Sequence, residues 1–115
     1  MNLNYSLHSN SFVFCSLDSS PFAEEDVLMS FREGEGMTYI VSEQTAQAAG
    51  VDFKERWAWI TVNTVTALNA TGITAHISAA LAAYKIPCNM VAAFYHDHLF
   101  VPFDSAEAAL RALRA

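Results

Sequence analysis

The sequence predicts a small α+β domain in which strands and strand hairpins alternate with helices. Residues 73–86 place apolar side chains at the spacing of one buried helix face, alternating segments flank them, and glycine or proline stands at the junctions. Of the 115 residues, 53% are hydrophobic and only 16% are charged, which suffices for a core. One compact, folded chain is therefore expected.

The first part of the chain is expected to form strands joined by short turns. Strand formers over residues 12–17 predict the first strand, which a turn containing serine and proline ends. The acidic residues 24–26 fit either one helical turn or a solvated loop. Residues 27–32 and 37–41 then read as a hairpin around the glycine-containing turn at 33–36.

A short helix and a strand with two tryptophans follow. Ser42 is placed to cap a helix over residues 43–49, and the glycine directly after this segment is placed to end it. Residues 57–63 alternate large tryptophans with smaller apolar side chains, which indicates a strand between two unequal faces. The face with Trp57 and Trp59 is expected to meet a partner or the other half of the chain.

The second half continues as loop, helix, hairpin and helix. Residues 64–71 form a loop that leads to the helix beginning at Gly72, and Pro87 prevents this helix from continuing. A strand is expected over residues 89–95, with the hairpin turning at 96–97 and a second strand ending at proline 102.

The chain is expected to close with an amphipathic helix. Asp104, with Glu107 three residues later, forms a variant of the capping box, and arginines lie in the last turn, where positive charge suits the helix dipole. The apolar face of this helix consists of Ala106, Ala109, Leu110 and Leu113.

The order of elements indicates an internal duplication. A strand, a helix, a hairpin and a helix follow one another from residue 57, and a shorter version of the same order begins at residue 12. We therefore expect a degenerate unit over residues 1–55 and a second unit over residues 56–115, packed as one compact domain. One shared sheet and two separate sheets both fit this order.

Charge and cysteine content exclude several classes of function. Six basic against twelve acidic residues give a net charge of −6, which disfavours a nucleic-acid surface. The longest apolar stretch is too short to span a membrane, and the N-terminal residues lack a signal-peptide pattern. Two distant cysteines, Cys15 and Cys88, show no pairing pattern, so a cytoplasmic location is expected.

Several segments resemble those of a small bacterial family of stand-alone ACT-domain proteins. The resemblance is carried by residues 64–72, the helix that follows, Pro87-Cys-Asn-Met-Val91 and Tyr95-His-Asp-His-Leu-Phe-Val-Pro102, and it extends upstream through residues 31–36 and 12–14. It implies a ferredoxin-like fold of tandem ACT-like units, with helices on one face of an antiparallel sheet. In ACT domains, small effectors, most often amino acids, bind between two units.

The resemblance also implies where a ligand would bind. The effector-binding loop before the first helix corresponds to residues 68–73, and the end of the following strand corresponds to Phe94, Tyr95 and Asp97. No catalytic domain is expected in this chain, so we expect a bound effector to have no enzyme to regulate in cis.

The chemistry of an amino-acid zwitterion supports the same residues. Backbone amides of Gly72 and Ile73 at the helix start would hold the carboxylate, and Asn69 or Thr71 would add a side-chain donor. Asp97 would take the ammonium group. The alternative is purely structural, because asparagine and threonine commonly cap helices and aspartate commonly fills turns.

Metal binding and catalysis receive less support. His96 and His98 flank Asp97, and His76 on the helix is a third candidate ligand, but the sequence places no full ligand set, so we expect no metal and no cofactor. Cys88 begins a strand without a nearby histidine to activate it. No enzymatic activity is expected.

Three hypotheses follow from the sequence. The first is a regulatory sensor that binds a small molecule, expected to be an amino acid, and acts on an unknown partner protein. The second is a ligand-free interaction or dimerisation module that uses sheet edges and the tryptophan face. The third is an enzyme that uses a metal or a thiol. A homodimer is expected, since twofold pairing is the commonest assembly.

Overall fold

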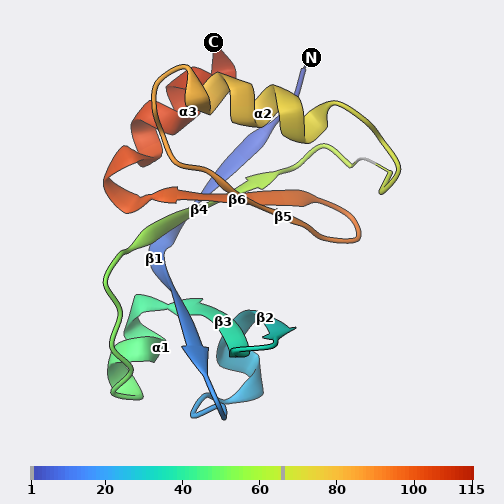
Figure 1. Cartoon of the computed structure of the whole chain (residues 1–115). Coiled ribbons are helices and arrows are strands. Elements are labelled where there is room, and N and C mark those ends of the chain that lie inside the picture. Colours follow the sequence, from blue (N-terminus) through green and yellow to red (C-terminus); the bar gives the residue numbers. More distant parts are fainter. Residues whose placement is uncertain (1, 66) are drawn as a thin grey trace. The chain divides into compact units, whose positions relative to one another are not determined.

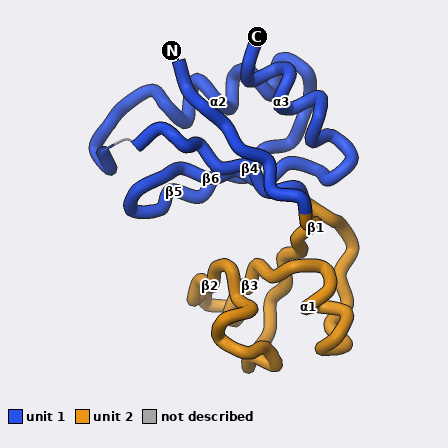
Figure 2. The backbone as a smooth tube through the Cα atoms, turned by 180° about the vertical axis from the view of Figure 1, so that it is seen from behind, with its two compact units in different colours: residues 1–9, 58–115 blue, residues 10–57 orange. Residues whose placement is uncertain are grey.

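The computed structural model describes residues 2–65 and 67–115, which form two compact units (Figure 2). Unit 1 comprises residues 1–9 and 58–115, and unit 2 comprises residues 10–57. The described residues form six strands and three α-helices, and this antiparallel α+β fold confirms the expected fold class. Residue 66, inside the expected loop, lies outside the described residues.

Unit 2 is a three-stranded antiparallel sheet with a short helix. The second half of β1 (Tyr5–Leu17) pairs with β3 (Gly36–Ser42), which in turn forms the expected hairpin with β2 (Val27–Glu33). Between β1 and β2, Glu24–Asp26 forms a single 3-10 turn, so the acidic segment is a helical turn rather than a loop. The small core of the unit contains Val13, Tyr39, Val41 and Ala46.

The helix α1 (Glu43–Ala48) begins at the expected cap. The Ser42 hydroxyl accepts a hydrogen bond from the Thr45 amide at 3.1 Å, which satisfies one of the amides left free in the first turn. After the helix, Gly50 has a φ of 70°, the left-handed conformation that commonly terminates helices. Both roles confirm the sequence-based assignment.

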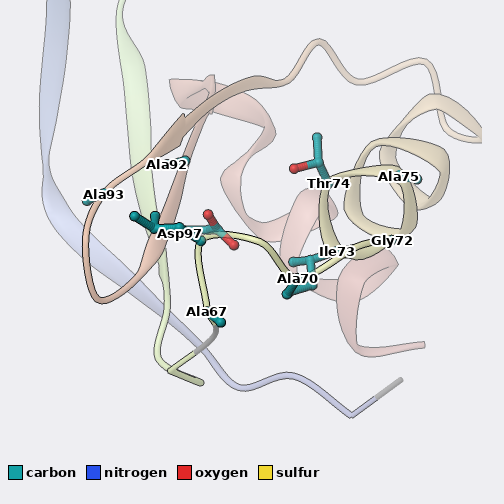
Figure 3. A pocket seen from close by; sticks show the side chains of 10 residues that line it. Ala67, Ala70, Gly72, Ile73, Thr74, Ala75, Ala92, Ala93 and Asp97 are labelled. Carbon is teal, nitrogen blue, oxygen red and sulfur yellow. The ribbon is translucent and has the colours of Figure 1, made fainter.

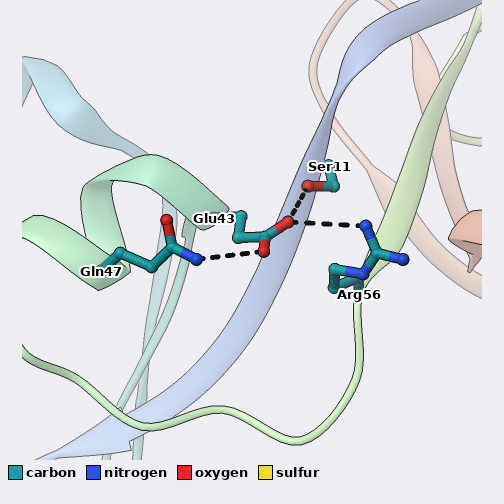
Figure 4. A network of polar contacts seen from close by, with 4 residues as sticks. All are labelled: Ser11, Glu43, Gln47 and Arg56. Atoms are coloured by element: carbon teal, nitrogen blue, oxygen red, sulfur yellow. Dashed lines mark hydrogen bonds and ion pairs between the residues drawn. The ribbon is translucent and has the colours of Figure 1, made fainter.

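A polar network joins this helix start to neighbouring segments (Figure 4). The Glu43 carboxylate accepts hydrogen bonds from the Ser11 hydroxyl at 2.5 Å and from the Gln47 amide at 3.2 Å. Arg56 lies 3.8 Å away through Nη1, and its side chain is 43% exposed, so this ion pair contributes little. The network fixes α1 against β1 within unit 2.

Replacing Ser42 by alanine is expected to lower the free energy of unfolding by roughly 1 kcal/mol, because the Thr45 amide loses its acceptor. Urea unfolding followed by circular dichroism measures the change. Ser30→Ala, at an exposed position on β2, serves as the control and is expected to have a smaller effect. Equal losses in the two variants would show that the cap does not stabilise α1.

Unit 1 is a sheet with two helices on one face. The strand order is β1-β4-β6-β5, with β4 (Trp57–Val62), β5 (Asn89–Ala92) and β6 (Asp97–Pro102). Figure 1 shows α2 (Ile73–Ala82) and α3 (Ala106–Arg114) on the same side of these strands. A 3-10 turn over Phe103–Ser105 leads into α3.

The alternation of the strands produces the core of unit 1. Ala58, Ile60 and Val62 on β4 are fully buried. Trp57 and Trp59 alternate with them and point to the other face of the strand. Leu99 and Val101 of β6 join this core together with Ile77 and Leu81 of α2. From α3 the core receives Ala106, Ala109, Leu110, Ala112 and Leu113. The predicted strand and closing-helix faces are confirmed.

The first strand is longer than predicted. β1 begins at Tyr5 rather than at residue 12, and Tyr5 is buried in the core of unit 1, with Leu7 packed against it. Polar residues hide this alternation in the sequence, because Ser6, His8 and Asn10 occupy the opposite face and serines follow Leu7 on the same face.

The hairpin between β5 and β6 also differs from the prediction. β5 ends at Ala92, and the turn closes where the Ala93 amide donates to the His96 carbonyl at 3.0 Å. Asp97 is therefore the first residue of β6, paired with Ala92, and not a turn residue. The apolar character of residues 94 and 95 is typical of a strand, but both side chains are exposed in the turn.

Two helix ends differ as well. α2 ends at Ala82, before the expected residue 86, because Lys85 adopts a φ of 57° and the Ile86 amide bonds back to the Leu81 carbonyl. Ser105 rather than Asp104 occupies the N-cap of α3 and makes no side-chain cap bond, so the cap lies one residue later than predicted.

Candidate functional site

A cavity of about 240 Å³ lies at the start of α2 in unit 1 (Figure 3). The loop after β4, the first turn of α2, the end of β5 and the start of β6 form its walls. We call it the α2 cavity. Its described lining residues are Ala67, Leu68, Ala70, Gly72, Ile73, Thr74, Ala75, Ala92, Ala93 and Asp97. Its volume lies below the roughly 300–1,000 Å³ of pockets for drug-sized ligands, so it suits a smaller molecule.

The helix start beside the cavity carries no side-chain cap. Gly72 occupies the N-cap with a φ of 86°, a left-handed conformation that glycine adopts without strain. A Cβ built on Gly72 would meet no described atom within 4 Å, so space is open next to this residue. The first intrahelical bond runs from the His76 amide to the Gly72 carbonyl. The preceding amides of this first turn have no intrahelical acceptor and can bind an anion.

Asp97 supplies a negative charge on the opposite wall. Among the described residues that line the cavity, it alone is ionisable. Figure 3 shows its carboxylate pointing from β6 toward the first turn of α2, where the Thr74 hydroxyl points back toward it. The cavity therefore has hydrogen-bond donors on one side and a carboxylate on the other.

Three of the seven residues predicted to bind a ligand line this cavity, namely Gly72, Ile73 and Asp97. The other four, Asn69, Thr71, Phe94 and Tyr95, are not among the lining residues. Phe94 and Tyr95 lie in the turn beyond the end of β5, 71% and 64% exposed, with ring centroids 4.9 Å apart. Their predicted role depends on a strand that continues to residue 95, whereas β5 stops at Ala92.

Sequence reasoning includes Ala70 in the effector-binding loop but identifies neither Thr74 nor the other alanines of the cavity. Thr74 lies in the first turn of α2, where a side chain can reach the space in front of the helix, whereas Thr71 precedes the helix. Alanine carries no chemical signal, so Ala92 and Ala93 become recognisable only once the hairpin register is known. Their small size is nevertheless what leaves the cavity open.

Two histidines of unit 1, His8 and His98, belong to a hydrogen-bonded network. The Trp59 indole donates to His98 Nδ1 at 3.0 Å, and the Thr61 hydroxyl lies 3.0 Å from the same nitrogen and 2.8 Å from His8 Nε2. The His8 and Trp59 rings stack at 3.4 Å. Among residues 2–65 and 67–115, no three potential ligands gather to hold a metal ion.

Neither cysteine is activated. Burial raises the pKa of the Cys88 thiol, whose Sγ lies 3.6 Å from Met90 Sδ. Burial also raises the pKa of Cys15, although a backbone hydrogen bond with Tyr39 acts in the opposite direction. A nucleophilic cysteine needs a lowered pKa, so both thiols have the character of core residues.

Comparison with known proteins relates the whole chain to one family. Two ACT-domain family models match, one over residues 52–115 and the other over residues 1–58. No curated protein sequence matches the chain. Among the described residues, no helix has the length and apolar character that crossing a bilayer requires.

Solved structures show the same relationship. A Vibrio cholerae protein of unknown function, described as a possible transport protein, is 34% identical, with a TM-score of 0.85 over 96% of this chain and 86% of that one. An Agrobacterium tumefaciens protein is 16% identical, with a TM-score of 0.82 over 98% and 87% of the two chains. The ligand-free regulatory subunit of aspartate kinase from Thermus thermophilus is 17% identical, with a TM-score of 0.67 over 95% and 92%. The chain thus belongs to the ACT-domain family.

Proposed function

We propose that this protein is a regulatory sensor that binds an amino acid in the α2 cavity. One observation carries the proposal: the cavity joins an uncapped helix start to the Asp97 carboxylate. A free α-amino acid presents a carboxylate and an ammonium group a short distance apart. The two walls of the cavity offer complementary groups to both.

The carboxylate of the ligand would bind at the start of α2. Amides of Ile73 and the residues after it point out of the helix, and the helix dipole places partial positive charge there. The Thr74 hydroxyl offers a further donor. The ammonium group would bind Asp97, since a charge-assisted hydrogen bond is stronger than a neutral one.

The relatives support a regulatory role. The similar Thermus thermophilus structure is a regulatory subunit of aspartate kinase, as is another from Thermus flavus. By analogy, a bound ligand would change how this chain pairs with itself or with a partner protein in the cytoplasm. A homodimer is the simplest assembly. In this role the chain acts by binding and not by catalysis.

A ligand-free interaction module is the second candidate. One observation favours it: Phe31 on β2 is 64% exposed, and β2 is the last strand of its sheet in unit 2. The tryptophan face offers less support than the sequence predicts, because Trp59 already stacks on His8 and Trp57 lies edge-on to Phe14 within unit 2.

Thermal unfolding in the presence of each proteinogenic amino acid tests the proposal. A ligand at 100 times its dissociation constant is expected to add about 2.7 kcal/mol to the free energy of unfolding. If no amino acid raises the melting temperature, the sensor proposal is wrong and the interaction module is favoured.

Asp97→Asn is expected to weaken the binding of any responding amino acid by about ten- to hundredfold, because a hydrogen bond to a charged group contributes roughly 1.5–3 kcal/mol. Isothermal titration calorimetry measures the change. Asp18→Asn, at an exposed position of unit 2, is the matched control and should leave the affinity unchanged. Unchanged binding in the Asp97 variant would place the ligand elsewhere.

A further inference from the structure

The strand β2 forms an open edge of the sheet in unit 2. It is the last strand in the order β2-β3-β1, and the described residues provide no strand on its other side. We infer that this edge binds an extended segment of a different protein, with an apolar centre and basic residues at both ends, by adding the segment as a further strand. The inference concerns unit 2 and does not depend on the α2 cavity of unit 1.

The backbone of β2 is available for pairing. β3 pairs with one edge of β2, so the N–H and C=O groups along the other edge have no strand partner among the described residues. The register with β3 is regular from Met29 to Glu33 and shifts only before Met29. Lysine, proline and bulges commonly protect edge strands, and residues 29–33 contain none of them. Residues 30–35 are all exposed, so an added strand has access to this edge.

One face of β2 offers apolar contacts to an added strand. Met29 and Phe31 share this face, because they pair with Ile40 and Thr38 of β3 and alternate residues of a strand point the same way. Phe31 is well exposed, and its ring can pack on an apolar side chain of a strand beside β2. The added segment should therefore carry apolar residues at alternate positions in its centre.

Unit 2 carries the entire net charge of the chain. Its nine acidic and three basic residues give −6, whereas the three acidic and three basic residues of unit 1 balance. Glu24–Asp26 immediately precede β2, and Glu33 and Glu35 lie at its other end. Arg32, the one basic residue of β2, offsets only one of these five negative charges. Both ends of the edge therefore attract basic residues.

The same charges disfavour a second copy of this chain at the edge. In an antiparallel pair of two β2 strands, the start of each strand lies beside the end of the other, so the acids before one strand approach the acids at the end of the other. A parallel pair would place the two Glu24–Asp26 turns side by side. Like charges meet in either arrangement, which is destabilising. A basic segment gains attraction at both ends instead, and this difference assigns the edge to a different protein.

Fluorescence anisotropy of labelled peptides with the full chain tests the inference. The first peptide, Lys-Lys-Val-Thr-Val-Thr-Val-Lys-Lys, has the chemistry expected of the segment. A second peptide has proline at two adjacent central positions, so that whichever of its edges faces β2 lacks a donor. A third has glutamate in place of every lysine. The first peptide is expected to bind about tenfold tighter than either of the others, because it alone combines strand pairing with basic ends.

Three outcomes of the peptide experiment would overturn the inference. Equal binding of the first and second peptides would show attraction by charge without strand addition. Equal binding of the first and third would show that the acids do not select the segment. No binding of the first peptide at millimolar concentration would show that the edge does not accept a strand.

A variant of the exposed ring shows whether the peptide binds at β2. Phe31→Ser is expected to weaken binding of the first peptide about tenfold. Tyr84→Ser removes a similarly exposed ring from unit 1 and should leave the affinity unchanged. Equal affinities of the two variants would place the peptide elsewhere. If the unmodified chain is a dimer that Phe31→Ser dissociates, the edge belongs to a second copy and the inference is wrong.

A pair of charge variants separates the ends of β2 from the net charge of unit 2. Glu24→Gln combined with Glu35→Gln removes one charge at each end and is expected to weaken binding about tenfold. Asp52→Asn combined with Glu55→Gln changes the net charge equally, outside β2 and its flanking turns, and should have a smaller effect. Equal losses would contradict recognition by the acids beside this edge. A melting temperature close to that of the unmodified chain separates lost binding from lost folding.

Discussion

Replacing Thr61 by valine is expected to lower the free energy of unfolding by roughly 1–3 kcal/mol, because the substitution leaves His8 Nε2 without its hydrogen-bond partner and removes one of the two contacts to His98 Nδ1. Valine matches threonine in shape and suits a strand, so packing and β-propensity stay nearly unchanged. Thr61 is 9% exposed, and water therefore replaces the lost hydroxyl poorly.

The donor and acceptor roles in this network follow from Trp59. An indole N–H can only donate, so His98 Nδ1 accepts and carries no proton. The Thr61 hydroxyl then donates its proton to the same nitrogen and accepts the Nε2–H of His8. The indole and the hydroxyl share the single lone pair of His98 Nδ1, which is available only while His98 is neutral.

The same network makes the protein sensitive to acid. Burial lowers the pKa of His98, the positive charges of His96 and His8 lower it further, and Asp97 acts in the opposite direction. Burial also lowers the pKa of His8. Because the unfolded histidines bind protons more readily, stability is complete above about pH 6.5 and is lost as the pH falls from there through the lower pKa values of the folded state.

Urea titrations at several pH values between about 7 and 5 measure the stability lost in Thr61→Val and the stability lost on acidification. Thr38→Val, at a half-buried position of β3 whose hydroxyl donates an exposed hydrogen bond to Glu33, is the matched control and should change stability by less than about 0.5 kcal/mol. His98→Asn keeps an acceptor near the Nδ1 position but cannot titrate, so its stability should fall less on acidification. If the Thr61 variant were as stable as the control, the hydrogen bonds of the network would not contribute to the stability of unit 1.

Replacing Leu81 by alanine is expected to lower the free energy of unfolding by roughly 2–5 kcal/mol, more than the loss expected for Thr61→Val. Leu81 is fully buried on α2, where it packs in the core of unit 1 with Ile77 and Leu110. Removing three carbon atoms loses their burial and leaves a cavity that close packing cannot fill. Such a loss is a large part of the roughly 5–15 kcal/mol typical of a domain.

Urea unfolding again provides the measurement, with an unchanged slope showing that the same surface is exposed. Leu28→Ala removes the same atoms from a side chain that is 39% exposed on β2, and it should cost clearly less. Similar losses for the two leucines would mean that α2 is not anchored through Leu81. Because α2 also forms one wall of the cavity, the variant should bind a responding amino acid more weakly.

The helices and most strands are predictable from the sequence because their burial is periodic. Ile77 and Leu81 lie one helical turn apart, and Ala58, Ile60 and Val62 alternate with the tryptophans. The start of β1 is not predictable in this way, because its outward face is rich in serine and asparagine. There the hydrogen-bonding sheet, and not residue preference, determines the conformation.

The candidate site is predictable only where its chemistry is local. Gly72 and Ile73 can be identified because a glycine before a helix is visible in sequence, and Asp97 because a carboxylate at a predicted hairpin is equally visible. The positions of Ala92 and Ala93 depend on which residues of β5 and β6 pair, and pairing is a long-range property. The role of Phe94 stays a prediction, although the strand expected at this residue is absent because β5 ends at Ala92.

The path of β1 through both units determines which truncated variants can fold. The family models match the two halves of the chain in succession, but the compact units are interlaced, because residues 1–9 belong with residues 58–115. A truncated product beginning at Ala58 would keep both long helices and yet lack the strand that borders β4. The unpaired backbone groups along the exposed edge of β4 would promote aggregation. Excising the stretch between Ser9 and Ala58 and bridging the gap is the route to an isolated unit 1.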